Sequence, residues 1–489
     1  MSTADSAPTP VRRIVGPFNR VEGDLEVTLD IVAGRVAAAY VNSPLYRGFE
    51  QILQGKAPQD ALTLVPRICG ICSVAQSAAA ARTLADAAGI RPPPNGVLAA
   101  NIALAVENVA DHLTHFYLYF MPDFARPDYA AAPWFGDTAA RFRAVSGSAG
   151  AEFLAARAGF MDCMGLLAGK WPHTLALQPG GSTRPLQGSE IMRLQRLVRA
   201  FRRFLEQRCY GAALEDVVAI ASREALTALC ARAAGADFAR FVALADALDL
   251  WRVGRGSDIF LCVGAYAGDD GALFPAGVWD GAPTAFDAAQ VREDTSHGWY
   301  VATGSAEHPA HSATVPDADN PAGYSWCKAP RLGGRVVETG ALARQVVAGQ
   351  PLARALVADH GGSVAARVAA RLIEAARVML AVEGWLACLR PGEPYCIAAH
   401  LADETVGTGL VEAARGALGH WLSVRRGRIH NYQIIAPTTW NFSPRDVAGQ
   451  PGALEQALAG LAVTDAGAIP AIVHHVVRSF DPCMVCTVH

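Results

Sequence analysis

Two pairs of cysteines are the residues of this chain whose type and spacing are best suited to chemistry. One pair, Cys69 and Cys72, lies near the start of the chain in Cys-Gly-Ile-Cys, and the other, Cys483 and Cys486, lies near its end in Cys-Met-Val-Cys. A Cys-x-x-Cys pair places two thiolates on the same side of a tight turn, where they chelate one soft metal ion. Either pair alone is typical of a structural zinc half-site or of a redox dithiol.

The distance between the two pairs argues for one shared metal centre. A zinc ribbon joins its pairs across about 15–20 residues, whereas nearly the whole chain separates Cys72 from Cys483. If all four thiolates meet, the C-terminal residues return to the core, which suits a metal that is kept dry and whose proton access is controlled. Cys72 lies at the expected start of a helix, where the helix dipole favours a thiolate. His489, the last residue, offers an imidazole and a carboxylate three residues after Cys486.

The composition limits the classes of protein that this chain can be. Its 489 residues carry 42 Lys and Arg against 45 Asp and Glu, a net charge of −3 that gives no general attraction for nucleic acid or an anionic membrane. Hydrophobic residues make up 52% and charged residues 18%, which predicts a large core, a large partner interface or both. No apolar run approaches the ~20 residues of a membrane span, and the N-terminus has no signal-peptide core. Most of the eleven cysteines stand singly in apolar contexts, so we expect a reducing compartment and a cytoplasmic location.

The pattern of hydrophobic residues predicts one large, mainly helical body with small antiparallel sheets, an α+β fold with a central helical bundle. Helices are expected over about 73–88, 97–120, 190–208 and 341–389, and the last ninety or so residues are expected to mix loop and strand. We interpret the basic face of 190–208 as a solvated or subunit-facing surface rather than a nucleic-acid site, because the net charge of the chain is negative. The expected segments are a disordered tail (1–10), N-terminal strands (11–60), a helical core (61–253), a loop and strand insertion (254–340), helices (341–425) and a C-terminal segment returning to the metal site (426–489), with 11–489 forming a single domain.

The cysteine motifs, together with five further blocks, resemble the large, catalytic subunit of nickel–iron hydrogenases. The blocks span the chain in the family's order and are Arg20-Val-Glu-Gly23, Arg47-Gly-Phe-Glu50, Asp111-His-Leu-Thr-His-Phe-Tyr117, Arg415-Gly-Ala-Leu-Gly-His420 and Pro437-Thr-Thr-Trp-Asn441. The resemblance implies the fold of that subunit and its activity, the reversible heterolytic cleavage of dihydrogen to protons and electrons.

The resemblance also implies a role for individual residues at the centre. The four cysteines would bind nickel, and Cys72 and Cys486 would also bridge to an iron that carries carbonyl and cyanide ligands. Glu22 would take the proton from the thiolate of Cys483. The remaining implied residues are Arg415, Asp111 and Asp481 as a charged canopy, Thr438 as a hydrogen-bond donor to cyanide, Pro437 and Gln76 as further cofactor-lining residues, and Glu50, His489 and a main-chain carbonyl near Ile435 as magnesium ligands.

The chemistry requires these residue types and implies a partner. Heterolytic cleavage of dihydrogen needs an electrophilic metal and a nearby base, and a thiolate with a carboxylate in reach can remove the proton. The electrons need a separate route, yet this chain has no further cysteine cluster of ferredoxin type. We therefore expect an iron–sulfur small subunit, in a heterodimer or a dimer of heterodimers.

The sequence departs from the family pattern at three positions, and one of these departures is similar to the regulatory, hydrogen-sensing branch. Gln76 stands where the family usually has His, which is similar to the regulatory branch. The block Ala413-Ala414-Arg415 replaces Ala-Pro-Arg and is expected to loosen one wall of the canopy, and Asp24 replaces a His. Ile71 and Tyr119 occupy gas-channel positions that are smaller aliphatics in standard enzymes, so they are expected to narrow access for dioxygen, although core packing alone would also explain them.

Four functions remain open at this point. The leading expectation is a cytoplasmic hydrogen sensor that signals through its small subunit to a histidine kinase, and the alternative is a respiratory or uptake hydrogenase. The related quinone-site subunit of respiratory complex I has lost its metal cysteines, so the intact pairs argue against it, and a structural zinc protein is the simplest alternative. The sequence ends at His489, as expected either of a mature enzyme whose C-terminal extension has been cut or of the tail-less sensor type.

Overall fold

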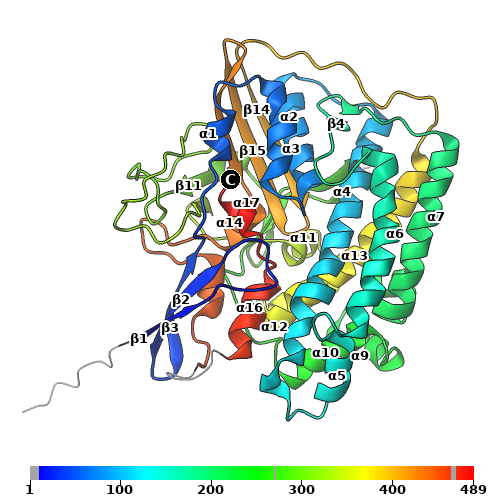
Figure 1. Cartoon of the computed structure of the whole chain (residues 1–489), viewed down its shortest axis with the longest axis vertical. Coiled ribbons are helices and arrows are strands. Elements are labelled where there is room, and N and C mark those ends of the chain that lie inside the picture. The colour runs from blue at the N-terminus through cyan, green and yellow to red at the C-terminus, as the bar shows by residue number, and fades with distance from the viewer. Residues whose placement is uncertain (1–9, 269–270, 464–469) are drawn as a thin grey trace, which may run out of the picture.

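The computed structural model describes residues 10–268, 271–463 and 470–489. Long helices form the body of the molecule, and small sheets flank them (Figure 1). The expected disordered tail over 1–10 lies outside the described residues except for Pro10. None of the described helices combines the length and the apolar character needed to cross a membrane.

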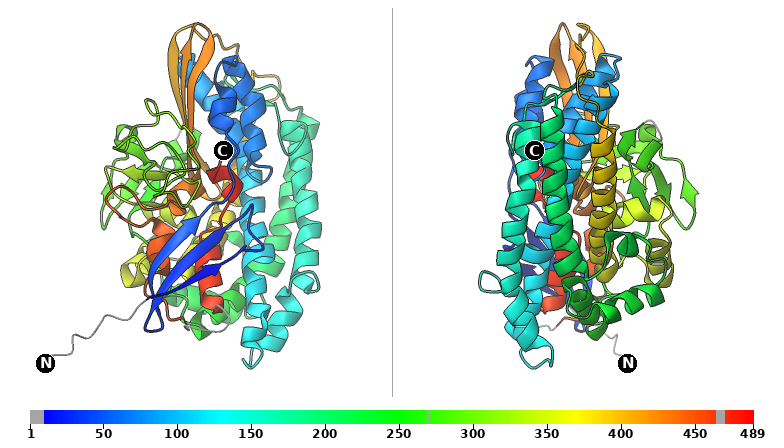
Figure 2. Two further views of the ribbon diagram at one scale, coloured as in Figure 1. Left: turned by 60° about the vertical axis from the view of Figure 1, so that its left-hand side comes forward. Right: turned by 90° about the vertical axis from the view of Figure 1, so that its right-hand side faces the viewer.

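Four long helices lie side by side and form the bundle that the hydrophobic pattern predicts (Figures 1 and 2). They are α4 (Pro94–Thr114), α6 (Ser148–Ala168), α7 (Gly188–Phe204) and α13 (Val364–Cys388). Proline in the first turn of α4 and a serine cap before α13, whose hydroxyl accepts from the Ala366 amide, fix two of the helix starts. π-Helical turns extend α4 to residue 120 and α7 to residue 210, so the helices expected over 97–120 and 190–208 are confirmed.

A three-stranded antiparallel sheet packs against α3 (Ser73–Ala87) and corrects one prediction. Its strands are β14 (Thr405–Ala413), β15 (Gly416–Arg425) and β16 (Arg428–Ile435), in that order. The prediction of helices throughout 341–425 is therefore wrong after Cys388, because residues 389–404 form no helix and the sheet begins at residue 405. A Cβ at Gly407 or Gly409 would overlap the backbone of α3, so this strand requires glycine where it touches the helix, and these glycines hide the alternating apolar pattern.

The N-terminal strands also form an antiparallel sheet, and its first loop carries Glu22. The strands β1 (Val11–Val15), β2 (Glu26–Val32) and β3 (Arg35–Asn42) pair in chain order, as the sequence predicts. Val27, Leu29 and Ile31 of β2 alternate into the core. The loop between β1 and β2 is thereby held against the C-terminal segment.

The C-terminal segment contains more helix than the sequence suggests. After β16 come α14 (Pro437–Asn441), α15 (Ala453–Leu458), α16 (Ala471–Ser479) and α17 (Met484–Thr487), so the prediction of only loop and strand is wrong here. These helices are short, and only tertiary packing stabilises them. The final residues lie inside the molecule, between the three-stranded sheet and the N-terminal sheet (Figures 1 and 2).

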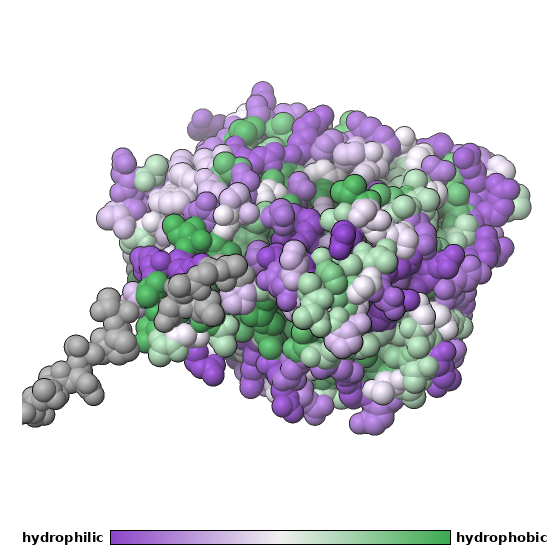
Figure 3. Space-filling view, turned by 60° about the horizontal axis from the view of Figure 1, so that its bottom comes forward, coloured by the Kyte–Doolittle hydropathy of each residue, from purple (hydrophilic) through white to green (hydrophobic). Residues whose placement is uncertain are grey.

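The remaining elements surround this frame. The insertion holds short strands, among which β13 pairs with β6 in parallel and the other pairings are antiparallel. Its strands are β6 (Phe260–Cys262), β7 (Ala265–Gly268), β8 (Gly271–Phe274), β9 (Gly277–Trp279), β10 (Pro283–Thr284), β11 (Val291–Asp294), β12 (Ala329–Leu332) and β13 (Glu338–Thr339). Elsewhere lie α1 (Phe49–Leu53), α2 (Ala61–Leu64), α5 (Phe135–Phe142), α8 (Leu214–Val218), α9 (Arg223–Arg232), α10 (Asp237–Ala247), α11 (Ala341–Val347), α12 (Pro351–His360), β4 (Leu177–Gln178) and β5 (Gly181–Ser182). Figure 3 shows polar and apolar residues interspersed over the lower face of the molecule.

Candidate metal centre

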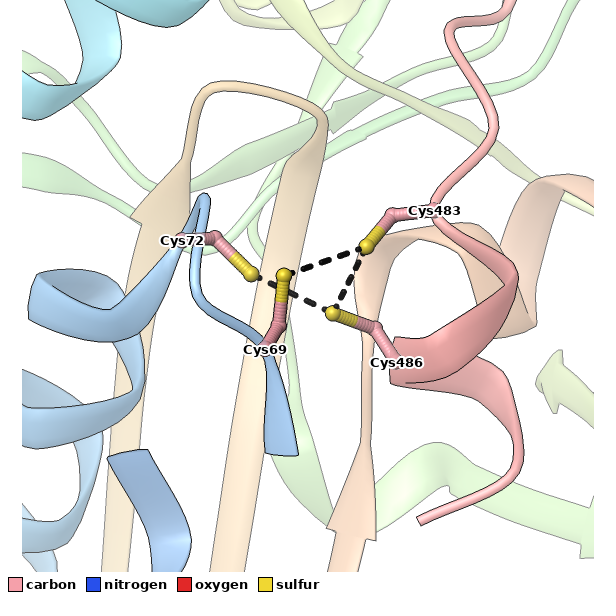
Figure 4. A group of neighbouring side chains, drawn as sticks. All are labelled: Cys69, Cys72, Cys483 and Cys486. Atoms are coloured by element: carbon pink, nitrogen blue, oxygen red, sulfur yellow. Dashed lines mark hydrogen bonds between the residues drawn. The ribbon is translucent and has the colours of Figure 1, made fainter. Parts of the chain in front are cut away.

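Four cysteine sulfurs from opposite ends of the chain meet in the core (Figure 4). The Sγ atoms of Cys69 and Cys483 lie 3.5 Å apart, those of Cys72 and Cys486 3.2 Å apart, and those of Cys483 and Cys486 3.0 Å apart. All four sulfurs lie within 4.8 Å of one another, and all four residues are buried. Cys72 directly precedes α3, and Cys483 directly precedes α17, so two helix N-termini face the cluster.

The dimensions of the cluster fit one metal ion with four thiolate ligands. Metal–sulfur bonds of about 2.3 Å place neighbouring sulfurs about 3.3–3.8 Å apart, depending on the coordination geometry. Hydrogen bonds from neighbouring thiols hold the pKa of Cys69 well below its usual value, while the thiol contacts and burial raise the pKa of Cys72. A bound cation would replace the shared protons and relieve this crowding of sulfur atoms.

Glu22 lies beside the cysteine tail because its backbone pairs with that tail. Its amide donates to the carbonyl of Pro482 (3.4 Å), and its carbonyl accepts from the amide of Met484 (2.7 Å), which gives a parallel bridge to Cys483. Burial raises the pKa of the Glu22 carboxyl and a charge on Cys69 raises it further, against the lowering effect of Arg415. The protonated form of this carboxyl is therefore favoured more than that of an exposed glutamate.

A charged canopy, defined as Asp111, Arg415 and Asp481, lies next to the cysteines. The Arg415 guanidinium donates to both carboxylate oxygens of Asp111 (2.5 and 3.2 Å), to the Asp481 carboxylate (3.0 Å) and to the Asp481 carbonyl (3.0 Å). All three residues are buried, and Arg371 of α13 donates to the second oxygen of Asp481 (3.3 Å). The arginine is therefore fixed from both sides by carboxylates.

The two carboxylates of the canopy differ in their tendency to hold a proton. Burial raises the pKa of Asp111 to about 7, although Arg415 opposes the shift. Burial also acts on Asp481, but the charges of Arg415 and then His115 and Arg371 outweigh it and lower the pKa of Asp481. The surroundings therefore favour the ionised form of Asp481 more strongly than that of Asp111.

Comparison with known proteins agrees with this geometry. The family model described as nickel-dependent hydrogenase matches residues 47–133 and 150–489. This chain belongs to the nickel-dependent hydrogenase family. It is 30% identical to the large subunit of the periplasmic [NiFeSe] hydrogenase of Desulfomicrobium baculatum, over 98% of this chain and 95% of that one, and 26% identical to the hydrogenase-2 large chain of Escherichia coli K12, over 98% and 97%.

Solved structures of the family share the fold. The [NiFeSe] hydrogenase of Desulfomicrobium baculatum superposes with a TM-score of 0.85 at 28% identity, and the Ni-Fe-Se hydrogenase of Desulfovibrio vulgaris Hildenborough with a TM-score of 0.82 at 30% identity. Each comparison covers 98% of this chain and all of the other. The mainly helical fold with small sheets is thereby confirmed, and the chain is the large subunit of a nickel–iron hydrogenase.

Three residues are predicted to line the cofactor: Pro437, Thr438 and Gln76. The first two begin α14, and Gln76 lies in α3. Thr438 in the first turn of α14, after Pro437, accepts a hydrogen bond from the Cys483 amide (3.1 Å), so it adjoins the metal centre. Gln76 lies one turn into α3 from Cys72, and its side chain meets His420 Nε2 (3.0 Å). Tyr432 contacts the other nitrogen of His420 (2.9 Å), so the amide of Gln76 is fixed by a buried chain of hydrogen bonds.

The two residues predicted to line a gas channel belong to different elements. Ile71 is part of the turn between Cys69 and Cys72 and is half-buried. Tyr119 belongs to the π-helical end of α4, and burial raises the pKa of its phenol to about 12. The charges of Arg415 and the canopy carboxylates act on the same phenol, so Tyr119 lies within electrostatic range of the canopy.

The predicted magnesium residues also meet, around a lysine that the sequence analysis did not select. The Nε2 atom of His489 lies 3.3 Å from a Glu50 oxygen, which also accepts from the Ile434 amide (2.9 Å), next to Ile435. Lys328 Nζ lies 3.0 Å from the same oxygen and also contacts Glu293, Thr314 and Gln433. Burial would raise the pKa of Glu50, but the charge of Lys328 outweighs it and lowers that pKa to about 2.

Sequence reasoning missed the buried charges that surround the centre. They are Lys328, Glu293, Arg344, Arg371, Glu374 and Glu412, each at most 4% exposed. Isolated lysines, arginines and glutamates are ordinarily surface residues, so single positions gave no signal. For the arginine and glutamate of α13, the apolar character of the whole 364–388 helix was the one available indication of burial.

Proposed function

We propose that the four cysteines hold a nickel ion and that Cys72 and Cys486 share it with an iron carrying carbonyl and cyanide ligands. The observation that carries this proposal is the meeting of four buried sulfurs with the backbone of Glu22. Such a centre supplies an electrophilic site at which dihydrogen is cleaved heterolytically. The chain's own residues then have to exclude water, orient the charges and remove the proton.

In this proposal, Glu22 accepts the proton that first resides on the sulfur of Cys483. Its backbone is bonded to both neighbours of that cysteine, which keeps the residue beside Cys483. The raised pKa of Glu22 makes it a better proton acceptor than an exposed glutamate. Arg415 supplies a fixed positive charge beside the sulfurs, while Asp111 and Asp481 hold its orientation.

We propose a magnesium ion bound by Glu50, His489 and the carbonyl of Ile435. Magnesium prefers oxygen ligands, which Glu50 and the Ile435 carbonyl would supply, and the His489 imidazole lies 3.3 Å from the Glu50 carboxylate. Lys328 brings a second positive charge to this place, which Glu293 balances with a second carboxylate. The ion would tie the C-terminal residue to the core and so keep the Cys483–Cys486 segment in place.

The partner of this large subunit is a hydrogenase small subunit, which the family implies. We propose that it carries the iron–sulfur clusters that take up the electrons. We further propose a cytoplasmic hydrogen-sensing role, with a histidine kinase as the receiver of the signal. Gln76 on His420, and Ile71 and Tyr119 at the centre, support this role, since larger residues at the channel restrict dioxygen more than dihydrogen.

Uptake of hydrogen for respiration is the second candidate. It is favoured by relatives such as the uptake hydrogenase large subunit of Afipia carboxidovorans, 26% identical over 98% of this chain and 95% of that one. Purification of the complex from its native cells distinguishes the two. A histidine kinase that co-purifies and responds to dihydrogen supports sensing, whereas a small subunit with a twin-arginine leader and a membrane-bound acceptor supports uptake.

A cysteine exchange tests the metal centre itself. Cys483→Ser is expected to remove most of the bound nickel and all hydrogen–deuterium exchange activity, because a serine hydroxyl replaces neither a thiolate ligand of nickel nor the sulfur that first holds the proton. Cys388→Ser is the matched control, since Cys388 is exposed and far along the chain from the cluster. Full nickel content and activity in Cys483→Ser would contradict the proposed centre.

A further inference from the structure

Arg344 of α11 is a buried arginine whose five N–H groups all have acceptors. Its side chain is 1% exposed. Nε and Nη2 donate to the Glu374 carboxylate (3.0 and 2.7 Å), and Nη1 donates to Glu412 (2.6 Å). The two remaining N–H groups bind main-chain carbonyls, Nη1 that of Ala413 (2.9 Å) and Nη2 that of Ala414 (2.9 Å). A planar guanidinium is the side chain that can serve four groups in this fork geometry.

The two carbonyls belong to the turn that presents Arg415. Strand β14 ends at Ala413 and β15 begins at Gly416, so Ala414 and Arg415 form a two-residue hairpin turn between a paired Ala413 and Gly416. Gly416 has a positive φ of 130°, whereas neither Ala414 nor Arg415 is among the described residues of positive φ. Negative φ at both central residues is typical of a type I turn, which accepts proline at its first central position.

Thr339 and Gly340, which precede α11, pack against the same turn. The Thr339 hydroxyl accepts from the Ala417 amide (2.6 Å), and a Cβ on Gly416 would overlap Thr339 and Gly340. The start of α11 and the hairpin tip therefore have no free space between them. Arg344 lies one turn into this helix, and the Arg344 amide bonds to the Gly340 carbonyl (2.9 Å).

We propose that Arg344 is a positioning residue that sets the direction of Arg415 by holding the carbonyls of Ala413 and Ala414. The inference rests on the proposed function, in which Arg415 is the positive charge beside the sulfurs. Each peptide unit is planar, so a fixed Ala414 carbonyl also fixes the amide nitrogen and the Cα of Arg415. The side chain of Arg415 therefore leaves the turn in a defined direction. The canopy carboxylates then receive a guanidinium that already points toward them.

The surrounding charges explain why an arginine is tolerated in this place. Glu374 and Glu412 neutralise it, and His112 Nε2 contacts the same Glu374 oxygen (3.0 Å). Burial would lower the pKa of Arg344, but the two carboxylates outweigh burial and raise it. The guanidinium therefore stays protonated, so it keeps all five N–H donors, including those bonded to the carbonyls of Ala413 and Ala414.

The test compares Arg344→Lys with Arg344→Lys/Ala414→Pro in the purified heterodimer. Four quantities are measured: bound nickel, dihydrogen oxidation per nickel, the urea midpoint, and the infrared bands of the iron ligands. Lysine keeps the charge but cannot reach four acceptors, so oxidation per nickel is expected to fall at least tenfold, with shifted bands. Proline fixes φ at the turn without restoring the ion pairs, so it is expected to recover at least a third of the activity while the midpoint stays low.

Several results would overturn the inference. Unchanged activity per nickel in Arg344→Lys would do so, as would a proline variant that recovers nothing, or that recovers activity only together with the urea midpoint. If Arg344→Lys binds too little nickel to measure, Glu412→Gln takes its place, because it weakens one ion pair of the Arg344 guanidinium. It is expected to lower activity per nickel at least threefold, and adding Ala414→Pro is expected to restore part of that activity. A wild-type complex without carbonyl and cyanide bands would instead refute the proposed function.

Discussion

Replacing Glu22 by glutamine separates its role as a proton acceptor from any structural role. The bonds that hold this residue beside Cys483 are made by its backbone, and within the described residues no group hydrogen-bonds to its carboxylate. Glu22→Gln therefore keeps the size of the side chain and every bond of that backbone. We expect nickel content and the unfolding midpoint to stay at the wild-type values.

The expected loss of activity follows from the proton transfer alone. A positioned acid or base contributes about 10²–10⁴-fold to a rate, which corresponds to about 2.7–5.4 kcal/mol in the barrier. Hydrogen–deuterium exchange and dye reduction are both expected to fall within that range. Glu26→Gln is the matched control, because Glu26 lies in β2 and accepts only from Asn42 (3.2 Å) within the described chain.

Two outcomes would refute this reasoning about Glu22. Exchange at the wild-type rate in Glu22→Gln would show that the proton leaves by another group. Loss of nickel would show that the carboxylate serves to build the centre. The ratio of exchange activity to bound nickel is therefore the quantity to report.

Two further predictions concern the buried charges. Lys328→Met leaves the buried carboxylates of Glu50 and Glu293 without their ammonium and is expected to lower the free energy of unfolding by about 3–5 kcal/mol, measured by urea titration. An unchanged midpoint would mean that the proposed magnesium ion alone neutralises both carboxylates. Burial would raise the pKa of Glu374, but Arg344 outweighs it and lowers that pKa from 4.5 to about 2, so its contribution to stability is complete above pH 4.5 and is lost as the pH falls toward 2. The urea midpoint of the wild type should therefore fall more steeply between pH 5 and pH 3 than that of Glu374→Gln, and equal slopes would contradict the assignment.

The cysteine cluster could be predicted from sequence because its chemistry leaves a local signature. Two Cys-x-x-Cys pairs are recognisable without any structure, and if all four cysteines share one metal centre the tail has to return to the core. The meeting of Glu50 with His489 followed from the same resemblance, and the structure brings their side chains within 3.3 Å. The bundle helices were predictable because a long apolar stripe repeats with the helical period.

Other features depend on tertiary packing and left no local signal. The strands over 405–425 are rich in glycine and alanine where they touch α3, so the alternation that marks a strand is weak there. The short helices α15 and α16 form only because other elements cover them. Lys328 and Arg344 are buried beside carboxylates that lie far away in sequence, and such pairing is visible only in three dimensions.

Infrared spectroscopy of the purified complex, in the window between the protein amide bands and the water bands, tests the central claim most directly. A nickel–iron centre held by the four cysteines predicts carbonyl and cyanide stretches, together with nickel and iron in the metal analysis. These bands should shift when dihydrogen is added and should be absent from Cys483→Ser. A silent spectrum from protein that contains zinc and lacks nickel would contradict the account.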